Sequence, residues 1–234
     1  MNKLKIAVIS DIHANLEAFN AVITAIGKVD KILSLGDFVG YGAKPNEVIK
    51  TADELKMISV MGNHDYASLT DNTSGLNPYA AVAVHWTHKH LSDENKKFLN
   101  KLPLTANFRV DKNTFLLVHG SPLDPLNDYI FPNTDENFLI ELLKRTSSNV
   151  LLLGHTHIPM LFKSKLRGRY ILNPGGVGQP RDLDPGASYA IISEKNGILH
   201  FEHYRVKYNI DKTADEILAA GLPSILAERL YYGQ

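Results

Sequence analysis

The stretch "KLKIAVISDIHANLEAFNAVITAIG" spans residues 3–27, and its hydrophobic pattern changes halfway along. Up to Ser10 it is short and rich in isoleucine and valine, which is typical of a buried strand. After a few polar residues, apolar side chains recur at helical spacing at Leu16, Phe19, Val22, Ile23 and Ile26. The stretch therefore predicts a strand, a loop and a helix in that order.

The same succession is repeated further along the chain. "DKILSLG" (residues 30–36) predicts a second buried strand, and "MISVMG" (residues 57–62) predicts a third. Between them, Pro45 suits the first turn of a helix that runs to about Leu55, because proline's missing N–H needs no partner there. Strands that alternate with helices predict a parallel sheet with crossover connections.

The rest of the chain predicts a mixture of strands and helices. A helical region over residues 77–102 is divided by Ser92, which suits the N-cap of its second helix. We expect strands over residues 104–110, 113–120, 149–153, 159–165, 169–173, 187–193 and 198–205. The first two of these strands are expected to pair antiparallel around a short polar turn.

Three further helices complete the prediction. One spans residues 134–147 after a proline-rich loop over 121–133, and it is expected to bury Phe138, Leu139, Leu142 and Leu143. Two helices close the chain, the first opened by a capping box of Thr213 and Glu216. Because no repeat or flexible linker interrupts the pattern, we expect one α/β domain over residues 1–234, with two sheets packed face to face.

Composition excludes several classes of protein. Basic and acidic residues both number 25, so no net field attracts the chain to nucleic acid or to an anionic membrane. Cysteine is absent, which excludes disulfides and thiolate metal sites. No apolar run approaches the roughly 20 residues that span a bilayer, and the N-terminus lacks a cleavage signal. We therefore expect a cytoplasmic protein with no membrane partner.

Polar side chains follow the predicted strands at the points where the strands end. They are Asp11, His13, Asp37, Asn63, His64, His119, His155 and His157. Because the carboxyl ends of strands in an open α/β sheet meet at one edge, these groups are expected to face one crevice. In "DIH" and "GHTH" a one-residue interval would let both side chains leave an extended backbone on the same side. Imidazole, carboxylate and carboxamide ligands suit Mn, Fe, Zn, Co or Ni.

Each of these elements also has an ordinary structural explanation. A strand-end aspartate is usually a helix cap, and Gly, Asn and Asp in "GNHD" are turn formers. The metal-site interpretation gains its weight from the joint occurrence of all the groups at strand ends. His85, His88 and His90 lie on a predicted helix, and we expect them to be exposed to solvent and not to form another metal site.

The order "D-x-H … GDxxG … GNHD … VHG … GHTH", over residues 11–157, resembles the calcineurin-like metallophosphoesterase superfamily. "VHGSPLDPLNDYIFP" and "NPGGVGQPRDLDPGASYA" are similar to its small bacterial and archaeal phosphodiesterase-like, or diadenosine-tetraphosphatase-like, branch. The resemblance implies a four-layer α-β-β-α sandwich of two mixed β-sheets flanked by helices. The chain departs from that branch at Gly176, where serine is usual.

The resemblance also implies roles for single residues. Asp11, His13 and His157 would bind one divalent metal ion, Asn63, His119 and His155 a second, and Asp37 would bridge the two. Mn is the first expectation, with Fe, Zn, Co and Ni as alternatives. Two such ions roughly 3.5–4 Å apart clamp a phosphoryl group and share a hydroxide that attacks phosphorus.

Further residues are candidates for contact with the substrate. His64 would protonate the leaving oxygen or stabilise the transition state. Asp65 would orient His64 through a hydrogen bond, or it would simply cap a turn. Arg181 would grip a phosphate or instead pair with Asp182 or Asp184. Tyr41 would stack on a base or an aryl leaving group, or it would simply be packed.

The substrate class follows from two missing arginines. Protein phosphatases of this superfamily carry arginine in "GDxVDRG" and before "GNH", whereas this chain has "GDFVGYG" and Met61. Fewer cationic groups favour a small phosphodiester or a nucleotide polyphosphate over a phosphomonoester, although Arg181 would compensate. A catalytically idle scaffold and a nuclease are alternatives; the ligand positions are filled and no basic surface is evident, so no stable nucleic-acid complex is expected. The oligomeric state stays open.

Overall fold

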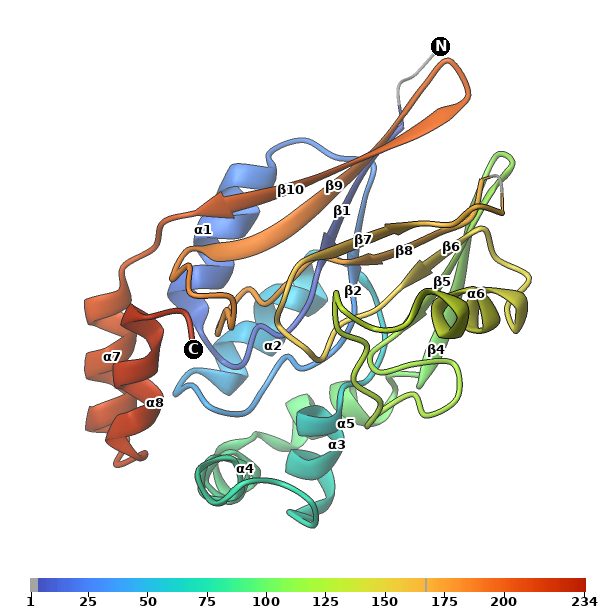
Figure 1. Ribbon diagram of the computed structural model, residues 1–234. Coiled ribbons are helices and arrows are strands. Elements are labelled where there is room, and N and C mark those ends of the chain that lie inside the picture. Colours follow the sequence, from blue (N-terminus) through green and yellow to red (C-terminus); the bar gives the residue numbers. More distant parts are fainter. Residues whose placement is uncertain (1–3, 167) are drawn as a thin grey trace.

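The computed structural model describes residues 4–166 and 168–234, which form two five-stranded sheets (Figure 1). In the first sheet the strand order is β10 (Ile198–Val206), β9 (Ala187–Lys195), β1 (Lys5–Ile9), β2 (Lys31–Ser34) and β3 (Ile58–Ser59). In the second it is β4 (Thr105–Val110), β5 (Asn113–Val118), β6 (Val150–Leu152), β8 (Tyr170–Asn173) and β7 (Met160–Lys163). Both sheets are mixed, because β1, β2 and β3 run parallel, as do β5, β6 and β8, while β9 and β10 in the first sheet and β4 and β7 in the second pair antiparallel with their neighbours.

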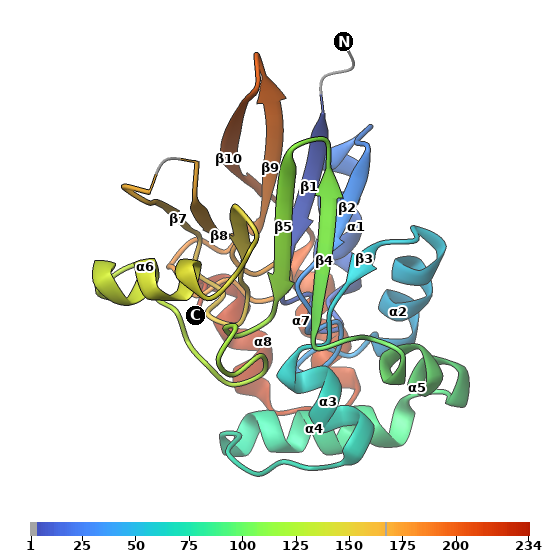
Figure 2. The same ribbon diagram turned by 90° about the vertical axis from the view of Figure 1, so that its right-hand side faces the viewer.

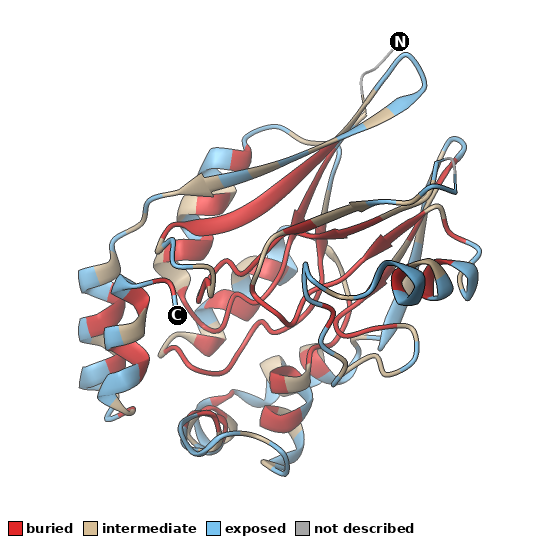
Figure 3. Ribbon diagram, in the orientation of Figure 1, coloured by how far each residue is buried: buried red, intermediate tan, exposed pale blue. Residues whose placement is uncertain are grey.

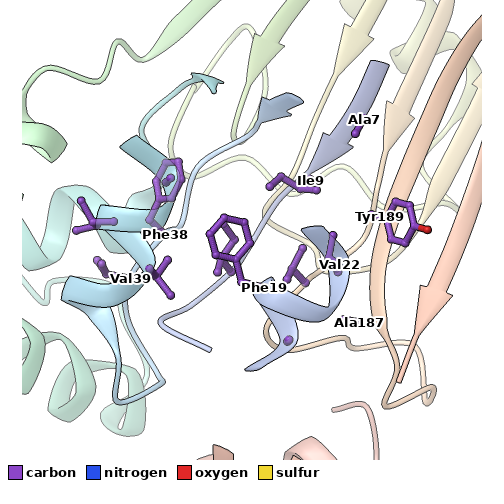
Figure 4. Close-up of a cluster of buried hydrophobic side chains, with 14 of the residues drawn as sticks. Ala7, Ile9, Phe19, Val22, Phe38, Val39, Ala187 and Tyr189 are labelled. Carbon is purple, nitrogen blue, oxygen red and sulfur yellow. The ribbon is translucent and has the colours of Figure 1, made fainter. Parts of the chain in front are cut away.

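The alternation of side chains along β1 separates two apolar layers. Ala7 and Ile9 face the helices α1 (Leu16–Ile26), α2 (Pro45–Glu54) and α5 (Asp93–Asn100), where Phe19 of α1 is fully buried (Figure 4). Ile6 and Val8 face the second sheet and pack with buried side chains of β5, β6 and β8. The two sheets therefore share one apolar interface, as predicted.

The fourth layer is α6 (Glu136–Lys144), which covers the other face of the second sheet (Figure 2). It buries Leu139, Leu142 and Leu143 against that sheet, but Phe138 is 41% exposed, so its expected burial is wrong. Phe138 lies in the first turn, which faces solvent. The four layers, helices on sheet on sheet on helix, confirm the predicted sandwich.

The remaining helices lie beyond the edge at which β1, β2, β5 and β6 end. They are α3 (Asn63–Thr70), α4 (Pro78–His90), α7 (Ile210–Ala219), α8 (Ser224–Glu228) and the short 3-10 helix η1 (Arg229–Tyr231). In Figure 1, α3 and α4 lie below the sheets and α7 pairs with α8 at one side. None of the helices in the described residues combines the length and apolar character that crossing a bilayer requires.

Helix boundaries agree with the sequence except at two places. Pro45 opens α2 and the Ser92 hydroxyl caps α5, as expected. The predicted capping box at the start of α7 is wrong, because the Asn209 side chain caps this helix and Thr213 lies within it, where its hydroxyl donates to the Asn15 side chain. The sequence also gave no indication of α3, since "GNHD" is typical of a turn.

Candidate metal centre

Two groups of buried ligand atoms lie in the loops at this edge of the sheets. The first contains the Asp11 carboxylate and the imidazoles of His13 and His157. The His13 and His157 Nε2 atoms are 3.2 Å apart, and Asp11 Oδ1 lies 3.3 Å from His157 Nε2 and 3.9 Å from His13 Nε2. All three residues are almost completely buried.

The second group contains Asp37, His119 and His155. His119 Nε2 lies 3.3 Å from Asp37 Oδ2 and 3.1 Å from His155 Nδ1. The Asn63 Oδ1 atom is 3.0 Å from His119 Nε2. Asp37 Oδ2 is also only 3.6 Å from His13 Nε2 of the first group. The Asp37 carboxylate thus lies between the two groups.

Unusual backbone conformations bring these side chains together. Positive φ angles occur at Asp11, His13, Asp37, His155 and His157, with values from 49° to 67°. The expected extended backbone in "DIH" and "GHTH" is therefore wrong, although both pairs of side chains do converge. Left-handed backbone is unfavourable for such residues and is kept where the surrounding structure enforces it, which is common at functional sites.

Hydrogen bonds between loops enforce this conformation. The backbone N–H groups of Asp11 and His13 donate to the carbonyl oxygens of Gly36 and Asp37, at 3.1 and 2.9 Å. The His155 N–H donates to Asp11 Oδ2 at 3.2 Å, which joins the loop after β6 to the loop after β1. Figure 3 shows these loops as buried, so they form a rigid framework without regular secondary structure.

Three imidazoles are oriented by carbonyl oxygens. The Nδ1 atoms of His13, His119 and His157 lie 3.0, 2.7 and 2.5 Å from the carbonyl oxygens of Val39, Leu35 and Gln179. A carbonyl accepts only, so in the neutral imidazoles these contacts assign the proton to Nδ1 and leave a lone pair on Nε2 that faces the centre.

The resulting cluster fits metal ions. Asp11 Oδ1 and Asp37 Oδ2 are buried and have no hydrogen-bond partner among the described residues, and Asp11 Oδ1 faces the Nε2 lone pairs of neutral His13 and His157. A buried carboxylate oxygen without a donor is costly unless a cation satisfies it. Metal–nitrogen and metal–oxygen bonds of about 2.0–2.2 Å place neighbouring ligand atoms about 3 Å apart, which is the spacing seen in both groups.

Ionisation states agree with this interpretation. Burial lowers the pKa of His155 to about 3 and the pKa values of His13 and His157 well below the usual value. These imidazoles are neutral at pH 7, the form that binds metals. At His119 burial alone would lower the pKa, but the adjacent Asp37 carboxylate has a larger effect in the opposite direction. The pKa of His119 is therefore raised to about 9. A proton on His119 thus occupies the position that a cation would take.

His64 and Asp65 occupy the first turn of α3. The His64 N–H donates to Asp37 Oδ1 at 2.8 Å, and its ring lies against His13 with ring centres 4.9 Å apart. Burial lowers the pKa of His64 to about 4. The Asp65 carboxylate accepts the backbone N–H groups of Gly62, Asp37 and Val39, so the proposed hydrogen bond to the His64 ring is wrong and the capping role is correct.

Arg181 lies beside the first group and carries no ion pair among the described residues. Its guanidinium donates to the Tyr41 hydroxyl at 3.2 Å and to Gln179 Oε1 at 3.0 Å. The alternative pairing with Asp182 or Asp184 is wrong, because Arg205 pairs with both. The Arg181 charge therefore remains available for an anion.

Tyr41 is packed and not open for stacking. It is only 5% exposed, with its ring centre 4.6 Å from that of His13 and 4.5 Å from that of His64. Tyr129 was missed by the sequence analysis. This residue belongs to the loop over 121–133, which borders the site, and its ring stacks on His155 with ring centres 3.8 Å apart. The only hint in the sequence was an aromatic pair in the loop that follows His119.

The three histidines of α4 lie outside the centre. His85 and His90 are exposed, as predicted, whereas His88 is half-buried with its Nδ1 atom 2.9 Å from the Ser68 carbonyl oxygen. His85 pairs with Asp71, and His90 stacks on Trp86. Gly176 lies against His157, since a Cβ atom there would be 3.1 Å from that residue's Cβ.

Known proteins share this sequence and fold. The profile of the calcineurin-like phosphoesterase superfamily domain matches residues 4–197. Uncharacterized protein MJ0912 of Methanocaldococcus jannaschii is 40% identical over 252 aligned residues, with both chains fully covered. The crystal structure of a metallophosphoesterase from Sphaerobacter thermophilus is 37% identical, with a TM-score of 0.85 and full coverage of both chains. Hypothetical protein PH1004 from Pyrococcus horikoshii OT3, at 21% identity and 99% coverage of each chain, has the same fold with a TM-score of 0.89. The chain therefore belongs to the calcineurin-like phosphoesterase superfamily and is a metal-dependent phosphoesterase.

Proposed function

We propose that the protein is a binuclear phosphoesterase that hydrolyses small phosphodiesters or nucleotide polyphosphates. The observation that carries this proposal is the position of Asp37 Oδ2, which is 3.6 Å from His13 Nε2 and 3.3 Å from His119 Nε2. One carboxylate oxygen thus serves two groups of buried ligands. Asp11, His13 and His157 would hold one divalent cation and Asn63, His119 and His155 the other, with Asp37 shared.

Imidazole and carboxylate ligands accept Mn, Fe, Zn, Co and Ni, and the resemblance to the superfamily makes Mn the first expectation among them. Two cations held by these residues would supply an activated water molecule and would neutralise charge on the phosphoryl oxygens. The chain contributes the rest: six of the seven proposed ligand side chains are buried and Asn63 is half-buried, so they are positioned before the substrate arrives and little reorganisation is needed.

His64 would act on the leaving oxygen or on a charged phosphoryl oxygen. With its pKa lowered to about 4 by burial, the imidazole is neutral at pH 7 and acts as a hydrogen-bond donor instead of a permanent cation. Its backbone is held by the bond to Asp37 Oδ1. Asp65 positions the loop that carries Asp37, because it accepts the Asp37 and Val39 backbone N–H groups.

Arg181 would bind a phosphate oxygen. Its partners Tyr41 and Gln179 are neutral, so its charge is not consumed within the protein. The places of the two phosphatase arginines are taken by Tyr41 and Met61, both of which are buried. With one arginine in place of several, a diester monoanion is favoured over a monoester dianion. This favours the phosphodiesterase over the alternative phosphomonoesterase, and the complete ligand set disfavours an idle scaffold.

The test is to strip the protein of metal, reload it with Mn and measure initial rates on three substrates. These are bis-p-nitrophenyl phosphate, p-nitrophenyl phosphate and diadenosine tetraphosphate. We expect diester turnover well above monoester turnover, with two metal ions per chain by elemental analysis. One ion per chain at full activity contradicts the binuclear proposal, and no hydrolysis of any substrate with both sites filled favours the scaffold.

A further inference from the structure

A pair of exposed aromatic rings extends outward from the metal centre. Tyr129 stacks on His155 with ring centres 3.8 Å apart, and Phe131 lies almost parallel to Tyr129, at 7° and 5.8 Å between centres. The two side chains are 51% and 39% exposed. His155, Tyr129 and Phe131 thus form a row of rings that begins at a candidate metal ligand and ends in solvent.

The loop that carries this pair is held in place. Ile130, between the two rings, is 4% exposed and packs into the core under α6, so the side chains on either side of it both point outward. The Phe131 N–H donates to the Thr134 hydroxyl at 3.0 Å, and the Ser121 hydroxyl donates to Asp128. The rings are therefore positioned before any ligand binds, which lowers the entropic cost of binding.

The pair borders the centre at the second ligand group. Tyr41 contacts His13 of the first ligand group, whereas Tyr129 contacts His155 of the second. A phosphoryl group between the two ligand groups would thus have the aromatic pair beside the second group, at His155.

We propose that Tyr129 and Phe131 form a stacking shelf for the nucleobase of a nucleoside phosphoester whose phosphoryl group lies at the metal centre. This inference rests on the proposed phosphoesterase activity and narrows its substrate class. Parallel rings present flat faces, and every nucleobase offers a flat face to stack on them. An alkyl chain would need an enclosing pocket, which two exposed rings on one loop do not supply.

The test compares two diesters with the same leaving group: the p-nitrophenyl ester of thymidine 5′-phosphate and methyl p-nitrophenyl phosphate. We expect the wild-type protein to prefer the nucleoside ester, mainly through a lower KM. In Phe131→Ala, kcat/KM on the nucleoside ester should fall roughly 5- to 100-fold more than on the methyl ester. Phe131→Tyr should restore the preference, because it keeps the ring.

Phe138→Ala is the matched control, because Phe138 has the same chemistry and similar exposure, 41%, but lies on α6. Saturation-transfer NMR with thymidine 5′-phosphate gives a second readout, in which contact with the base should be lost in Phe131→Ala and kept in Phe138→Ala.

The outcomes separate the two proposals. If the ratio of kcat/KM for the two esters is the same in the wild type and in Phe131→Ala, the stacking shelf is overturned and the phosphoesterase proposal stands. No turnover of either ester with both metals bound contradicts the phosphoesterase proposal instead, and the NMR contacts then decide the shelf. A change of sedimentation coefficient in Phe131→Ala would show that the rings form a contact between subunits, which also overturns the shelf.

Discussion

Each oxygen of the Asp37 carboxylate has a separate task. Oδ2 faces His13 and His119, and Oδ1 accepts the His64 backbone N–H at 2.8 Å. Asp37→Asn keeps the shape but removes the charge between the two ligand groups. Substituting groups that merely support metal ligands lowers metal affinity or activity by about 10- to 100-fold. We therefore expect Asp37→Asn to lower kcat by at least that factor.

The measurement is the initial rate on bis-p-nitrophenyl phosphate together with the metal content per chain. Asp53→Asn, an exposed carboxylate on α2, is the matched control and should keep both values. Full activity of Asp37→Asn would contradict the shared ligand.

His64 lies next to both ligand groups without belonging to either in the proposed assignment. His64→Ala removes a hydrogen-bond donor and leaves every ligand in place. We therefore expect kcat to fall roughly 10²- to 10³-fold while two metals stay bound. Single-turnover rates and elemental analysis separate these effects, with His85→Ala as the control on the exposed face of α4. A loss of metal that accounts for the lost rate would make His64 a structural residue.

Single residues show where the sequence was informative and where it was not. The convergence of the proposed ligands Asp11, His119 and His157 was predictable because strand ends in a mixed α/β sheet meet at one edge. The identity of Tyr129 as a neighbour of His155 was not, because it depends on the path of a 13-residue loop. The roles of Asp65 and Arg181 depend on which of several nearby groups each one binds. In the structure Asp65 accepts backbone N–H groups, and Arg205 forms the ion pairs with the acidic residues near Arg181.

Among the elements, α3 matters most for the site. Its N-cap Gly62 lies directly under the Asp37 carboxylate: a Cβ atom at that position would be 2.0 Å from Asp37 Oδ1 and 2.4 Å from the Asp37 backbone nitrogen. No side chain fits there without displacing the proposed shared ligand. Because Gly62 has no side chain, the start of α3 can approach the loop after β2 this closely.

Gly62→Ala should consequently weaken metal binding more than it weakens the fold. The Cβ atom must push Asp37 away, so we expect metal affinity to fall by at least 10-fold, in the range seen when support of a ligand is lost. Gly27→Ala is the control, because a Cβ atom there meets open space and lies at the end of α1, although its φ of 60° strains the backbone. Isothermal titration calorimetry with Mn measures the metal affinity of both variants. Equal affinities in the two would show that Asp37 tolerates displacement.

Elements were predictable where their hydrophobic period is long and clear. The strands and helices α1, α2, α5 and α6 follow the sequence pattern, because their apolar faces are what the two sheets bury. Helix α3 has only eight residues, begins at a turn-forming "GN" and buries polar side chains such as Asp65 and Ser68. Its stability comes from contacts with Asp37 and α4, which no local pattern encodes.

At the scale of the whole molecule, a large set of buried titratable groups makes stability depend on pH. Burial lowers the folded-state pKa values of five histidines below 6.5, so the unfolded chain binds these protons more readily than the folded one; they are His13, His64, His155 and His157 of the cluster and His203 on β10. Two buried carboxyls act in the opposite sense, with pKa values raised to about 6 at Asp11 and about 8 at Asp65.

In the metal-free protein these contributions do not cancel. Between about pH 6.5 and pH 4, the four cluster histidines against the two carboxyls leave the unfolded chain about two protons richer, and His203 acts in the same direction. His119, with its folded-state pKa of about 9, is protonated in both states below about pH 6.5 and does not change this balance, so stability must fall as the pH falls. For a chain of this size we expect the unfolding midpoint to drop by on the order of 10 °C from pH 7 to pH 5. Differential scanning calorimetry of the protein in the presence of a chelator measures this unfolding midpoint at each pH. His64→Gln removes one of the four histidines and should make the fall shallower, whereas His200→Gln, on β10, should not. A midpoint that is unchanged or higher at pH 5 would mean that the cluster takes up protons without unfolding, and that the imidazoles are not held neutral by burial.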